Sequence, residues 1–125
     1  MEVTALLLQG IFTAFEPLNL GLLIFGCLIG LFVGAMPGLG SVNGVAILIP
    51  ITFIVPPTAA IIFLAAVYYG AMYGGAISSV MLGIPGASTA VATVFDGRPL
   101  AQKGEAMTAL TAAAVGSFVG GTVSV

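Results

Sequence analysis

Two short segments of this chain combine a proline–glycine pair with small, hydroxyl-bearing and amide residues. They are residues 37–43 and residues 85–89. Proline and glycine interrupt helices, and an interrupted helix leaves main-chain N–H groups without intrahelical partners. Such N–H groups, together with the positive end of a helix dipole, attract anions, whereas free carbonyl groups attract cations. The candidate substrate-binding residues are Gly38, Leu39, Gly40, Ser41, Asn43, Gly86, Ala87, Ser88 and Thr89.

Both segments lie in a stretch that carries no ionic side chain. Glu16 and Asp96 bracket residues 17–95, which contain no Asp, Glu, Lys or Arg. The whole chain is 60% hydrophobic and 5% charged. One charge at the centre of a spanning helix costs about 2.5–3.5 kcal/mol on insertion scales. The sequence therefore predicts an integral membrane protein in contact with the lipid bilayer, and nothing in it suggests a nucleic-acid partner.

The residue types needed for most catalytic and metal sites are missing. The chain has no histidine and a single cysteine, Cys27, within an apolar run. It offers no metal-ligand cluster and no base that could activate a nucleophile. We therefore expect no enzyme, no metal site and no cofactor. Proton coupling usually needs an intramembrane acid or histidine, so Na⁺ held by carbonyl and hydroxyl oxygens is the more suitable coupling ion.

Length and hydropathy predict how these segments are positioned. A spanning helix needs roughly 20 mostly apolar residues. The predicted fold is an all-α integral membrane protein, a polytopic helical bundle with helices broken or kinked at the proline–glycine pairs. Its elements are an interfacial helix over 2–15 (or a frayed terminus), spanning segments over 18–36, 58–83 and 106–125, short or half helices over 42–55 and 87–95, and a polar loop over 96–105.

Glycines recur at four-residue spacing in the spanning segments. In a helix this spacing places small residues on one face, where two helices can approach closely in lipid. Such faces usually serve packing, and a proline–glycine pair can also be a simple turn between helices. The tyrosines at 68, 69 and 73 could equally form an interfacial belt. The predicted packing glycines are Gly26, Gly30, Gly34, Gly70, Gly74, Gly116 and Gly120.

The segment over 96–105 and the C-terminal end of the chain give two further expectations. Both basic residues, Arg98 and Lys103, lie in 96–105, so the positive-inside rule places this loop in the cytoplasm. The chain stops within an apolar, glycine-rich segment. We therefore expect residues 1–125 to be a single membrane domain, the truncated N-terminal part of a longer permease.

Six short motifs of the chain form a recognisable set. They are residues 34–40, 68–75, 83–86 and 96–99, with 7–10 and 17–20 at the start. In this order they resemble the large membrane subunit of tripartite tricarboxylate transporters, the TctA family, and the tyrosine–glycine block is the most specific part. The resemblance implies a permease subunit of the bacterial inner membrane that works with a small membrane subunit and a periplasmic solute-binding protein. It also implies uptake of citrate-like tri- or dicarboxylates by ion-gradient-driven secondary transport.

Two functions from different classes remain at this point. In the first, broken helices line a cavity that passes a carboxylate. In the second, the chain is a non-transporting helical scaffold whose glycine faces drive oligomerisation and whose breaks are only turns.

Overall fold

Helices form nearly all of the computed structural model, which describes residues 2–125. In chain order they are α1 (Glu2–Ala14), α2 (Pro17–Ala35), α3 (Gly40–Leu48), the 3-10 turn η1 (Ile49–Phe53), α4 (Pro57–Leu82), the 3-10 turn η2 (Ser88–Ala90), α5 (Val91–Gln102) and α6 (Ala106–Ser124). No strand occurs in this part of the chain. The all-α membrane fold predicted from the sequence is confirmed.

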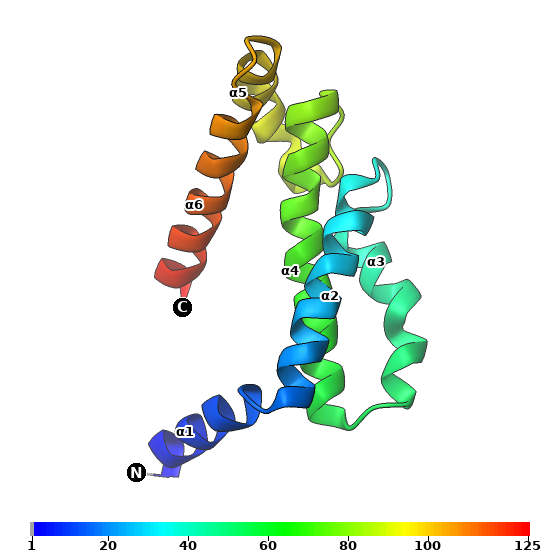
Figure 1. Ribbon diagram of the computed structural model, residues 1–125, viewed down its shortest axis with the longest axis vertical. Coiled ribbons are helices and arrows are strands. Elements are labelled where there is room, and N and C mark those ends of the chain that lie inside the picture. The colour runs from blue at the N-terminus through cyan, green and yellow to red at the C-terminus, as the bar shows by residue number, and fades with distance from the viewer. Residues whose placement is uncertain (1) are drawn as a thin grey trace.

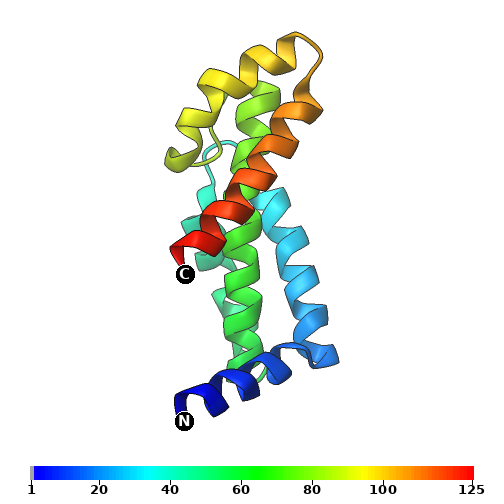
Figure 2. The ribbon, with the colours of Figure 1, turned by 90° about the vertical axis from the view of Figure 1, so that its left-hand side faces the viewer.

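Three helices, α2, α4 and α6, are long and apolar enough to cross a membrane. α2 and α4 lie side by side along the long axis of the molecule, and α6 runs beside the upper half of α4 in Figures 1 and 2. Helix α3 descends from the end of α2 toward the beginning of α4 (Figure 1). It changes to 3-10 geometry at η1, where Pro50 cannot donate a main-chain hydrogen bond.

Glycines set the distance between α2 and α4. A Cβ added at Gly26 would lie 2.8 Å from the Phe63 carbonyl oxygen, and one added at Gly74 would lie 2.5 Å from the Leu31 carbonyl oxygen. Real Cβ atoms essentially never approach other atoms this closely, so only glycine permits this backbone contact. The glycines of this contact are Gly26, Gly30 and Gly34 on α2, and Gly70 and Gly74 on α4.

The other two predicted packing glycines do not contact a neighbouring helix. A Cβ added at Gly116 or Gly120 would meet no atom within 4 Å. The reason is the position of α6, which is held at its N-terminal half, where Ala109 is buried and the Tyr73 hydroxyl donates to the Leu110 carbonyl at 2.9 Å. The packing of these two glycines finds no partner within residues 2–125 and stays a prediction.

The prediction of a polar loop over 96–105 is also wrong. Helix α5 continues through Gln102, and only 103–105 form the turn before α6. Gly97 lies against α4, and a Cβ there would be 2.6 Å from a Val80 methyl group. This close tertiary contact outweighs the turn preference of Gly97 and Pro99. The turn begins instead beside Gly104, whose φ of 82° favours glycine.

Helix α1 lies across the lower end of the bundle, at a steep angle to α2 (Figures 1 and 2). None of its residues is buried. Asn19 fixes the corner, because its side-chain amide is only 3% exposed and donates to the Thr13 carbonyl at 2.6 Å. This bond satisfies one of the last carbonyl groups of α1. The geometry suits a helix lying in the membrane interface, which stays a prediction.

Candidate functional site

The two interrupted segments meet in one cavity of about 410 Å³. They are separated by more than forty positions in the sequence. Even so, a Cβ added at Gly40 would lie only 3.8 Å from the Gly86 carbonyl oxygen. The long helix α4 closes one side of the cavity. The lining residues are Gly38, Leu39, Gly40, Ser41, Val42, Tyr68, Met72, Pro85, Gly86, Ala87, Ser88 and Thr89.

The first interruption joins α2 to α3 through two glycines in left-handed conformation. Gly38 has φ 90° and Gly40 has φ 69°, values that residues with a Cβ rarely adopt. Helix α3 then begins with no side-chain cap. The N–H groups of its first turn therefore lack a capping partner and lie beside the cavity, as the first donors of any uncapped helix do.

The second interruption turns the chain back along α4. Gly83, with φ 73°, ends α4 and donates its N–H to the Ser79 carbonyl at 3.1 Å. Gly86 is then wedged between α2 and α4, where an added Cβ would lie 2.8 Å from the Gly75 Cα. The buried Ser79 hydroxyl shares its proton between the Gly75 carbonyl of its own helix, at 2.7 Å, and the Ala90 carbonyl of the following turn, at 3.1 Å, and so links the two. The start of η2 is thereby fixed opposite the start of α3.

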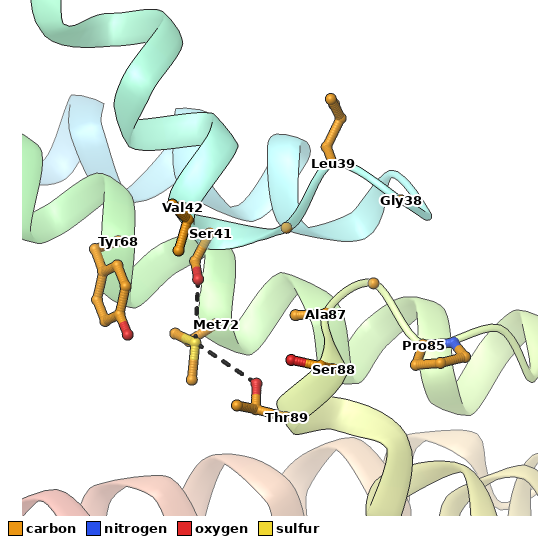
Figure 3. A pocket seen from close by; sticks show the side chains of 12 residues that line it. Gly38, Leu39, Ser41, Val42, Tyr68, Met72, Pro85, Ala87, Ser88 and Thr89 are labelled. Carbon is orange, nitrogen blue, oxygen red and sulfur yellow. Dashed lines mark hydrogen bonds between the residues drawn. The ribbon is translucent and has the colours of Figure 1, made fainter.

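Two hydroxyl groups in the cavity converge on one sulfur atom. Ser41 donates to the Met72 Sδ at 3.4 Å, and Thr89 approaches the same sulfur at 3.8 Å (Figure 3). A thioether is a weak acceptor, so neither hydroxyl is tied to a strong partner. Ser88 also presents its hydroxyl beside Thr89 in Figure 3. A carboxylate placed between these groups would be a better acceptor than the sulfur.

The cavity lies well inside the span of α4 and carries no charge. With a rise of about 1.5 Å per residue, Met72 is about 22 Å from the beginning of α4 and about 15 Å from its end. None of the lining residues is ionic. The polar groups available are main-chain N–H groups at two helix beginnings and the neighbouring hydroxyls. Together they can accommodate an anion without a basic side chain.

The comparisons with known proteins identify the family. The profile of the Tripartite tricarboxylate transporter TctA family matches residues 20–125. The chain belongs to this family. It is also 40% identical over 124 residues to a protein of Agrobacterium vitis described as an uncharacterized 52.8 kDa protein in the TAR-I ttuC' 3'region. That alignment covers 99% of this chain and 25% of the relative, and no solved structure matches.

In this TctA-family chain, all the predicted substrate-binding residues except Asn43 line the cavity. Asn43 is exposed on α3 and is not among the lining residues. It lies two positions beyond Ser41, and the helical turn of about 100° per residue carries it to another face. Its predicted contact with substrate has no support in this geometry. For the other residues, substrate binding stays a prediction.

Two residues of α4 that are not among the predicted site residues complete the cavity. Tyr68 and Met72 are four positions apart and therefore lie on the same face of the helix. This spacing was visible within the tyrosine–glycine block. Its significance follows only from the packing of α4 against both interruptions, which is a contact between segments distant in the sequence.

Arg98, predicted only to orient the chain in the membrane, also has a structural role. Its guanidinium donates to the Met81 carbonyl in the last turn of α4. The aliphatic part of its side chain packs against Gly83, because a Cβ there would be 3.3 Å from the Arg98 Cδ. A cation at a helix C-terminus is favourable. Arg98 thus attaches α5 to the end of α4, just before the second interruption.

Proposed function

We propose that this chain forms part of the carboxylate-translocating subunit of a tripartite uptake system, and that the cavity between the interruptions holds the passenger. Membership of the TctA family makes the chain a component of a tricarboxylate transporter. The observation that carries the finer proposal is the meeting of two uncapped helix beginnings, at Gly40 and Ser88, around one charge-free cavity. Main-chain dipoles and hydroxyls then supply the attraction for an anion.

The proposal covers tri- or dicarboxylates of the citrate type, moved by secondary transport. A small membrane subunit and a periplasmic solute-binding protein complete the system, in line with the tripartite nature of the family. We place the protein in the bacterial inner membrane as a multi-pass subunit. The segment over 96–105 would face the cytoplasm, because it contains both basic residues of the chain.

The scaffold alternative has less support. The glycine faces of α2 and α4 pack against each other within the chain, so they are not available for a second copy. The interruptions are also more than turns, because each approaches the other and both contribute to one cavity.

The test is uptake of labelled citrate and succinate by the full-length subunit with its partner proteins, in cells or proteoliposomes. Thr89→Val keeps the side-chain shape and removes one hydroxyl, and Ser41→Ala removes the other. We expect each variant to raise the KM for uptake about tenfold, because each loses one hydrogen bond to the charged carboxylate. Thr111→Val is the matched control, because its hydroxyl donates only to the Met107 carbonyl of its own helix.

Unchanged KM values for both variants would contradict the site assignment. Uptake of neither acid, nor of any other carboxylate tried, would contradict the proposed function itself.

A further inference from the structure

Two more cavities continue from the proposed carboxylate cavity along α5. The second cavity, of about 340 Å³, shares Met72 and Thr89 with the first. The third, of about 320 Å³, shares Thr93 and Ala113 with the second and reaches Asp96. The three cavities therefore adjoin in series, from the middle of the molecule to the end of α5.

One face of η2 and α5 provides the polar groups of this series. Thr89, Thr93 and Asp96 follow each other at spacings of four and three, which places them in one row along a helix. The facing wall is the N-terminal half and middle of α6, made of small residues. Those that line the second and third cavities are Ala109, Ala112, Ala113, Gly116 and Ser117.

Four hydroxyl-bearing residues line the second cavity, and two of them, Thr93 and Ser117, are not used by the protein. The Tyr73 hydroxyl donates to the Leu110 carbonyl, and the Thr89 hydroxyl approaches the Met72 sulfur. On the exposed side of α6, Thr111 and Thr122 donate to carbonyl groups of their own helix, at 2.8 Å in each case. The side-chain hydrogen bonds found within residues 2–125 include none from Thr93 or Ser117. Both oxygens are therefore available to a ligand in the cavity.

The charge of the row suits a cation. Asp96 is exposed at the far end of the series, and Arg98 is turned away from it, toward the Met81 carbonyl of α4. No Lys or Arg lines the second or third cavity. A carboxylate passenger would be repelled by Asp96, whereas a small hard cation prefers oxygen ligands such as carboxylate and hydroxyl groups.

We propose that the row Thr89, Thr93 and Asp96, with Ser117 opposite, forms a binding route for a small monovalent cation, Na⁺ in the first instance. The inference rests on the proposed function and adds to it a separate place for the driving ion. The cation route and the carboxylate cavity meet at Thr89 and Met72. A cation in the second cavity would there stand next to the anion, and each would stabilise the binding of the other.

The experiment measures carboxylate uptake by the full-length system over a range of NaCl, with choline chloride keeping the ionic strength constant. Asp96→Asn and Thr93→Val are compared with Thr111→Val. We expect the first two variants to raise the half-saturating Na⁺ concentration about fivefold or more. Thr93→Val removes one oxygen ligand, and Asp96→Asn removes the negative charge that attracts the cation. The KM for citrate at saturating Na⁺ should change less than about twofold, and Thr111→Val should match the unaltered protein.

Three outcomes would overturn the inference while leaving the proposed function intact. They are an unaltered Na⁺ dependence in both variants, a change confined to the KM for citrate, and uptake that proceeds equally in choline. Absence of carboxylate uptake by the unaltered system would remove the proposed function and the inference together.

Discussion

At the scale of single residues, the absence of a Cβ decides how closely α2 and α4 can approach. Gly34 faces the Ala71 main chain so closely that any side chain must displace one helix. Gly21, on the same helix, has no atom within 4 Å of an added Cβ. Both residues are glycines in helix α2, and they differ only in whether another helix packs against them.

We therefore expect Gly34→Ala to destabilise the full-length protein by about 1–3 kcal/mol, the usual effect of overpacking. Gly21→Ala should be neutral or slightly stabilising, because alanine is the better helix former. Thermal unfolding of both variants in detergent checks the pair. Equal stability of the two would contradict the close helix contact.

At the scale of elements, Arg98 joins α5 to α4 through the carbonyl of Met81. Arg98→Met keeps the apolar stem that covers Gly83 and removes the charge and the donors. We expect a loss of about 0.3–1 kcal/mol of local stability, the usual value for a cation at a helix C-terminus. Hydrogen exchange should accelerate in the last turn of α4, while Arg98→Lys should recover part of the protection. Unaltered exchange in Arg98→Met would contradict the capping role.

The elements also show what a sequence can and cannot predict. The three long helices follow from length and hydropathy, because a bilayer imposes both. The prediction of a polar loop over 96–105 is wrong because Gly97 and Pro99, which favour turns locally, lie within helix α5. Their conformation is set instead by the contact of Gly97 with Val80 on α4. Such contacts between distant segments are not encoded in any short window.

The same limit applied to the candidate site. Each interruption could be predicted from its proline and glycine residues, and so could the polar character of 38–41 and 86–89. That the two segments meet, and that Tyr68 and Met72 lie between them, depends on the packing of α2, α3 and α4 together. Asn43 is polar and close to Ser41 in the sequence, but the turn of the helix places it outside the cavity.

At the scale of the whole molecule, the fold brings two interrupted helices to one place within the span of α4. The chain spans 25% of the Agrobacterium vitis relative, so other parts of a full-length protein can add walls to the cavity. The central claim is that both interruptions already contribute to one carboxylate site. It requires that a bound anion contacts both at once.

The most direct measurement is cysteine labelling of the full-length protein in membranes, with Cys27 replaced by serine. Leu39→Cys and Ser88→Cys each place a thiol on one interruption, and Gln102→Cys, at the exposed end of α5 outside the spanning helices, serves as the control away from the cavity. The account predicts that a water-soluble maleimide modifies all three, and that citrate slows the reaction at positions 39 and 88 together but not at 102. Protection at only one of the two interruptions, or at neither while citrate uptake persists, would contradict it.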